Sequence, residues 1–167
     1  MIKVNKQTRL AFQTSFSQGI RQLFTDPQPG RVRYVYWLAH QINFAVFNLS
    51  APLHHLTRLI ILYVSLLLLQ LITFYLTSSQ TASVLTGLFF ALFGPVSETW
   101  VRLGPQEVYL VFFQLLSLFL LFRLLEKDSP RTKILLFLST IGIYFSKEIG
   151  LLWFLFPAFF WVINSNL

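Results

Sequence analysis

Long apolar stretches separated by short polar segments dominate the second half of the chain. The clearest is residues 59–76, where Ser65, Gln70 and Thr73 are the polar interruptions. A helix rises 1.5 Å per residue and about 20 apolar residues cross the hydrocarbon core of a bilayer, so this length is typical of a membrane-spanning helix. Apolar stretches of this kind predict about five spanning segments: 59–76, 84–96, 108–125, 134–146 and 149–163.

The N-terminal part of the chain has a different pattern. Between residues 7 and 24, larger apolar residues recur at helical spacing with Lys and Arg nearby, which predicts an amphipathic helix in the membrane interface. Packing of that helix on its own protein explains the pattern equally well. The turn signal of residues 25–30 ends it. Residues 35–49 keep apolar positions on one helical face but include His40, Gln41, Asn43 and Asn48, which favours a second interfacial helix over a span.

Composition agrees with the pattern, since 55% of residues are hydrophobic, only 11% are charged and the mean hydropathy is +0.64. We therefore expect an all-α fold: a polytopic membrane helix bundle at residues 58–167, preceded by interfacial helices at residues 1–57. We expect an integral membrane protein of the cell membrane, in contact with lipid. The absence of Cys excludes disulfides and thiolate metal sites, and three His without metal-ligand spacing predict no histidine metal site.

The net charge of +7 does not indicate nucleic-acid binding. The basic residues are interleaved with the predicted bundle, and no nucleic-acid motif accompanies them. The charge is better explained by membrane topology, because Lys and Arg are enriched on the cytoplasmic side.

Acids and bases occur at breaks between the predicted spans. These residues are Glu98, Arg102, Glu107, Lys147 and Glu148. Placing a charge at bilayer depth costs free energy, so such groups usually face one another, a cavity or a substrate. Counting alternating spans places all of them, together with the segment from His54 to Arg58, on the same face of the membrane.

The Lys147-Glu148 pair lies between two short apolar arms. A thirteen-residue arm is about 20 Å long and the hydrocarbon core about 30 Å thick, so this turn should lie below the membrane surface. Adjacent helical residues do not face each other, so both groups need partners elsewhere. The alternative is a structural pair that extends to a thinned interface.

Five short motifs occur in order along the chain: Gly-Arg-Val-Arg-Tyr at 30–34, Phe-Asn-Leu-Ser-Ala-Pro-Leu-His-His at 47–55, Ser-Glu-Thr-Trp at 97–100, Arg-Leu-Gly-Pro-Gln-Glu at 102–107 and Ser-Lys-Glu at 146–148. In order and spacing they resemble the polytopic glycosyltransferases of the GT-C superfold. That class includes protein O-mannosyltransferases and bacterial relatives that use polyprenyl-phosphate sugars.

The resemblance implies an inverting sugar transfer on the exoplasmic side. A carboxylate near the acceptor hydroxyl and cations near the donor phosphate are needed, because charge builds at both during displacement. The candidate catalytic acids are Glu98, Glu107 and Glu148. The candidate substrate-binding residues are Arg102, Lys147, Arg31, His54 and His55. The donor would be a polyprenyl-phosphate-linked sugar; no cofactor follows with certainty, although a divalent metal could take part.

Orientation and completeness follow less directly. Arg123, Lys127, Arg131 and Lys133 would make the face opposite the acids cytoplasmic, whereas the seven Lys and Arg before residue 59 favour the reverse. We adopt the first assignment because a long leading segment can translocate despite its charge, and because of the resemblance. Family members usually carry a first span and an acidic loop that this sequence lacks, so we expect an internal piece or a shortened form.

Simpler explanations exist for individual residues. Gly104 and Pro105 before Glu107 match a helix cap, Arg102 could anchor the bundle at the interface, and His54 and His55 match interfacial polar residues. For the whole chain the alternative is a small non-catalytic membrane protein. It would act as a scaffold or regulator for a membrane protein partner, with its charged turns as helix contacts.

Overall fold

The computed structural model of the chain describes residues 34–47, 50–102 and 107–147, and every element in these ranges is a helix. The helices are α3 (Tyr34–Phe47), α4 (Ala51–Thr77), α5 (Gln80–Leu92), α6 (Gly94–Val101), α7 (Glu107–Glu126) and α8 (Pro130–Ser146). The predicted all-α fold is confirmed for this part of the chain. The predicted amphipathic helix at 7–24 and the last apolar segment at 149–163 lie outside the described residues.

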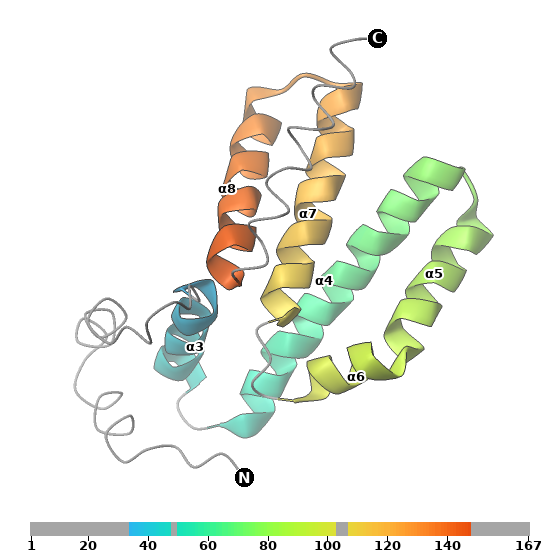
Figure 1. Cartoon of the computed structure of the whole chain (residues 1–167). Coiled ribbons are helices and arrows are strands. Elements are labelled where there is room, and N and C mark those ends of the chain that lie inside the picture. Colours follow the sequence, from blue (N-terminus) through green and yellow to red (C-terminus); the bar gives the residue numbers. More distant parts are fainter. Residues whose placement is uncertain (1–33, 48–49, 103–106, 148–167) are drawn as a thin grey trace.

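Helices α4, α5, α7 and α8 form two antiparallel hairpins (Figure 1). Helix α4 pairs with α5, α7 pairs with α8, and α4 and α7 pack against each other between them. Helices α3 and α6 both lie at the end of the bundle where α4 and α7 begin and α8 ends (Figure 1). We call this the α6 end, and the end that carries the α7–α8 loop the opposite end.

Helix α4 begins eight residues before the predicted apolar stretch. Ser50 is its N-cap residue in an extended conformation, and a proline occupies the first turn, where its missing N–H costs no hydrogen bond. The segment from His54 to Arg58 is therefore helical and belongs to the bundle. Apolarity did not reveal this start, because the first turns of α4 are polar on the side that faces α3 and α6.

The α4–α5 connection is shorter than residues 77–83, the interval between the first two predicted spans. Ser78 ends α4 in the left-handed conformation (φ 53°), and its N–H donates to the carbonyl of Phe74. Ser79 then caps α5, its side chain accepting a hydrogen bond from the N–H of Ala82. Each helix end thus has its own cap, so a two-residue link suffices.

Small residues lie where the helices of each hairpin approach. Ser83 of α5 donates to the carbonyl of Gln70 in α4 at 2.7 Å. A Cβ on Gly142 of α8 would come within 2.6 Å of the Phe113 ring in α7. Close backbone approach of this kind is how helices associate where no water drives them together.

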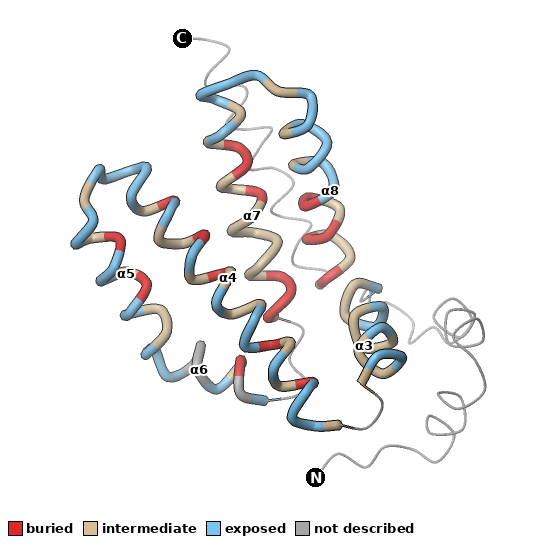
Figure 2. The backbone as a smooth tube through the Cα atoms, turned by 180° about the vertical axis from the view of Figure 1, so that it is seen from behind, coloured by how far each residue is buried: buried red, intermediate tan, exposed pale blue. Residues whose placement is uncertain are grey.

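Large apolar side chains cover the outer faces of the bundle. Figure 2 shows buried residues on the sides where helices face each other and exposed ones on the outside. Phe89 and Leu92 of α5 are 73% and 79% exposed, and α4 and α8 carry similar faces. Helices α4 and α7 are long and apolar enough to cross a membrane, in agreement with the predicted membrane location.

Candidate functional site

Two acid–base pairs lie at the α6 end. The first joins Glu98 and Arg102, one turn apart on α6, through Oε1 and Nη2. Their side chains are 57% and 71% exposed, respectively. An exposed ion pair of this kind adds little stability. Either side chain can therefore leave its partner and bind a ligand at a small cost in free energy.

The second pair joins the start of α7 to the end of α8. Nζ of Lys147 lies 2.5 Å from Oε1 of Glu107, and the lysine side chain is only 28% exposed. Glu107 is in the first turn of α7 and Lys147 directly follows α8. The sequence predicts that Lys147 needs a partner outside its own turn, and in the structure that partner is Glu107. This contact also holds the α7–α8 hairpin together at the α6 end.

A cluster of aromatic and histidine rings lies between α3 and the first turns of α4 and α7. The Tyr36 hydroxyl is 2.9 Å from Nε2 of His40, and the two rings meet edge to face with centroids 4.6 Å apart. Tyr36 also contacts Tyr109 of α7, and Phe44 contacts His54 of α4 at 4.9 Å between centroids. These contacts attach one face of α3 to the bundle.

Arg58 lies in the same region and is only 3% exposed. It follows His54 by one helical turn, so both side chains lie on the face of α4 that is covered by other elements. Its Nη1 donates to the carbonyl of Thr99 at 3.4 Å and to the carbonyl of Arg102. Arg58 thus connects α4 to the C-terminal end of α6.

His40 is held neutral by its surroundings. Burial, together with electrostatic interactions with Arg58 and His54, lowers the pKa of this imidazole to about 4. Its Nδ1 is buried and has no hydrogen-bond partner among the residues that the structure describes. A buried nitrogen without a partner is costly, and a charged one would cost more.

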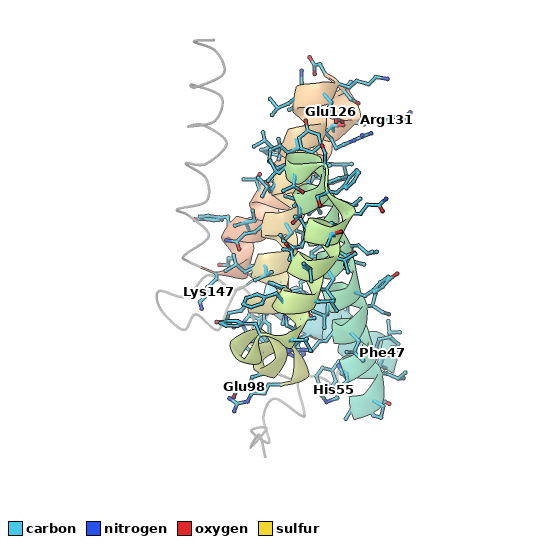
Figure 3. All side chains as sticks on the ribbon, turned by 90° about the vertical axis from the view of Figure 1, so that its right-hand side faces the viewer. Phe47, His55, Glu98, Glu126, Arg131 and Lys147 are labelled. Atoms are coloured by element: carbon cyan, nitrogen blue, oxygen red, sulfur yellow. The ribbon has the colours of Figure 1, made fainter. Side chains whose placement is uncertain are left out.

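The sequence-predicted site residues separate into three groups. Glu98 pairs with Arg102 and Glu107 pairs with Lys147, and both pairs lie towards the α6 end, where Figure 3 labels Glu98 and Lys147. His54 is buried in the ring cluster, while His55 is half-buried nearby. Arg31 and Glu148 lie outside the described residues, so this geometry does not test their predicted roles.

Sequence reasoning missed four residues of the cluster: Tyr36, His40, Arg58 and Tyr109. One signal was readable, because Tyr36 and His40, like His54 and Arg58, are four residues apart and so share a helical face. That spacing indicates a polar stripe within otherwise apolar helices. It does not say which stripes face each other.

The opposite end carries a different set of charges. Arg123 and Glu126 are 3.1 Å apart, and Lys133 and Asp128 are 2.6 Å apart, all of them exposed around the α7–α8 loop. A shallow surface depression lies nearby at the start of α5, lined by Gln80, Thr81, Val84 and Leu85. It contains none of the candidate residues.

Chemically, the α6 end offers carboxylates, a guanidinium and an ammonium within one region, which suits acid–base chemistry on a hydroxyl beside an anionic group. Within residues 34–47, 50–102 and 107–147, no group of three or more His, Cys, Asp or Glu side chains could share a metal ion.

Comparison of the chain with protein-family models, with curated proteins and with solved structures found no match.

Proposed function

We propose that the chain is a polytopic bundle of the cell membrane, in which α4, α5, α7, α8 and the apolar segment at 149–163 cross and α3 lies in the interface. At 1.5 Å per residue, α4 and α7 are about 40 and 30 Å long, enough for a hydrocarbon core of about 30 Å. The exposed apolar faces of α4, α5 and α8 support this, since lipid is a suitable solvent for them. Helix α5 is shorter, about 20 Å, and α6 continues from it along the α6 end.

We further propose that the protein is a membrane glycosyltransferase, or part of one, acting on a polyprenyl-phosphate-linked sugar. One observation carries the proposal: the Glu98–Arg102 pair at α6 and the Glu107–Lys147 pair, which joins the start of α7 to the end of α8, both lie towards the same end of the bundle. An arrangement that joins distant segments in this way is what a reaction centre needs, and the motif resemblance supplies the reaction class.

In the proposed reaction a carboxylate accepts the proton of the acceptor hydroxyl as that oxygen attacks the first carbon of the sugar. The bond from the sugar to the lipid phosphate breaks, and the phosphate leaves with the electron pair. Glu98 is the first candidate for the base because it is the more exposed of the two described acids at the α6 end. Arg102 and Lys147 would stabilise the departing phosphate. Arg31 and Glu148 keep their predicted roles as further cation and acid, and His54 and His55 theirs as substrate-binding groups.

The test measures sugar transfer from a radiolabelled polyprenyl-phosphate sugar by the full chain in lipid vesicles. Loss of a general base typically lowers rates by a factor of about 100 or more, so Glu98→Gln and Glu107→Gln should each reduce transfer on that scale. Glu126→Gln removes an acid of the opposite end, also paired with an arginine, and should leave the rate unchanged. Full turnover in both site variants and in Glu148→Gln would exclude these acids from catalysis.

A second candidate is the non-catalytic scaffold, and one observation favours it. Both described acids of the α6 end already have a cationic partner, as expected where charges serve only to join helices. This candidate predicts no transfer by the parent chain, and loss of a co-purifying membrane protein in Glu98→Gln but not in Glu126→Gln.

A further inference from the structure

Arg58 is the point at which α4 meets the end of α6. Its guanidinium is almost fully buried, and its Nη1 donates to the carbonyls of Thr99 and Arg102. Thr99 is in the last turn of α6, and Arg102 is the residue that caps it. The contact therefore joins the eighth residue of α4 to two backbone carbonyls, three residues apart, at the end of another helix.

The chemistry of a helix end explains why an arginine is suited to this position. The last four carbonyls of a helix have no N–H partner within it, and together they carry the negative end of the helix dipole. A guanidinium supplies donors and a positive charge at once. Few other side chains could satisfy two carbonyls from a neighbouring helix and remain buried.

This contact controls more than the helix end itself. Glu98 and Arg102 lie one turn apart on α6, so their direction depends on how α6 is seated. Only residues 103–106 separate Arg102 from Glu107, the first residue of α7. Holding Arg102 therefore restricts the positions of both described acids at the α6 end.

We propose that Arg58 is a positioning residue: by holding the C-terminal end of α6 against α4, it sets the geometry of the Glu98–Arg102 pair. The importance of this contact for sugar transfer rests on the proposed function. The contact itself does not, and it can be tested without any activity.

Trp100 provides the readout, because it lies on α6 beside Thr99 and is 4% exposed. In a chain whose other tryptophans are replaced (Trp37→Phe, Trp153→Phe and Trp161→Phe), Trp100 fluorescence reports the seating of α6. Arg58→Gln should shift its emission to the red and raise its quenching by acrylamide about twofold or more, because the two carbonyls lose their buried donor. Arg123→Gln, which removes an exposed arginine of the opposite end, should change neither quantity.

Arg58→Lys should give an intermediate value. Lysine keeps the charge, but its shorter side chain cannot reach both carbonyls. Circular dichroism and size-exclusion chromatography establish that each variant is folded. A folded Arg58→Gln chain with unchanged Trp100 quenching would overturn the proposal. Should the glutamine variant not fold, the lysine variant decides, and quenching equal to that of the parent would overturn the proposal.

The transfer assay provides a separate result. Where the parent chain transfers sugar, Arg58→Gln should lower kcat with KM little changed, because Arg58 would act through the catalytic pair and not on the donor. Where the parent shows no transfer, the proposed function fails, and the Trp100 measurement still tests the role of Arg58.

Discussion

His40 is the residue whose environment departs most from what its position in a polar-interrupted segment suggests. It belongs to α3 and lies near Arg58 and His54 of α4, and its pKa is lowered to about 4 from the ordinary 6.5. Between these values the unfolded chain binds a proton that the folded chain does not. The stability that a neutral His40 contributes should therefore be fully present above about pH 6.5 and decline as the pH falls towards 4. The free energy of unfolding should fall by at most about 3 kcal/mol through this group.

Thermal unfolding in detergent between pH 7 and pH 4 measures this decline. His40→Gln removes the titrating group and should flatten the dependence, even though the variant is less stable at pH 7 through loss of the Tyr36 contact. His55→Gln is the control for a half-buried histidine one position beyond the cluster. An identical pH dependence in parent and His40→Gln would show that other groups cause it.

At the scale of elements, the α7–α8 hairpin depends on the absence of a side chain at Gly142. A Cβ there would lie 2.6 to 2.8 Å from three atoms of the Phe113 ring. Overpacking of a helix contact costs about 1–3 kcal/mol, which exceeds the gain of about 1 kcal/mol in helix propensity from Gly to Ala. Gly142→Ala should therefore lower the unfolding midpoint in detergent.

The ring contact can be separated from other effects of this substitution. Phe113→Leu makes room, so Gly142→Ala should cost less in that background than in the parent. Gly87→Ala on α5 is the comparison, because its nearest neighbour is the end of the flexible Gln70 side chain. It should cost less than Gly142→Ala, and a larger cost at Gly87 would contradict this account of the packing.

At the scale of the whole molecule, the two sets of charges lie at opposite ends of the bundle. Figure 3 places Glu98, His55 and Lys147 towards one end and Glu126 and Arg131 at the other. If the bundle crosses a membrane as proposed, these ends face different compartments. Because the chain contains no Cys, single cysteines can report this directly.

Ala51→Cys, at the exposed start of α4, and Arg131→Cys, at the exposed start of α8, provide the test. A membrane-impermeant maleimide added to sealed vesicles of one orientation should label one of them at once and the other only after permeabilisation. Labelling of both from the same side would contradict the proposed topology. Which cysteine reacts first in intact cells would show whether the acids are exoplasmic.

How far the sequence predicts this molecule differs between its parts. The helical class and the positions of α5, α7 and α8 follow from the lengths of the apolar stretches to within four residues, but the predicted span 84–96 is interrupted at Phe93, and the helix α6 after it was not predicted. The start of α4 does not, since its first turns are polar and only the Ser50 cap indicates them. In the candidate site, charges at breaks between apolar stretches identified Glu98, Arg102, Glu107 and Lys147.

The sequence by itself indicated most of the helices, although not α6 or the first turns of α4, and which of the described charged residues share an end of the bundle, because the length and alternation of apolar segments decide both. Only the tertiary structure decided the partners: Glu107 for Lys147, the end of α6 for Arg58, and the ring cluster for His40. The physical reason is that helices rich in Leu and Phe on every side carry no marked face. Their rotation is decided by the close packing of small residues and by the few polar groups that must meet.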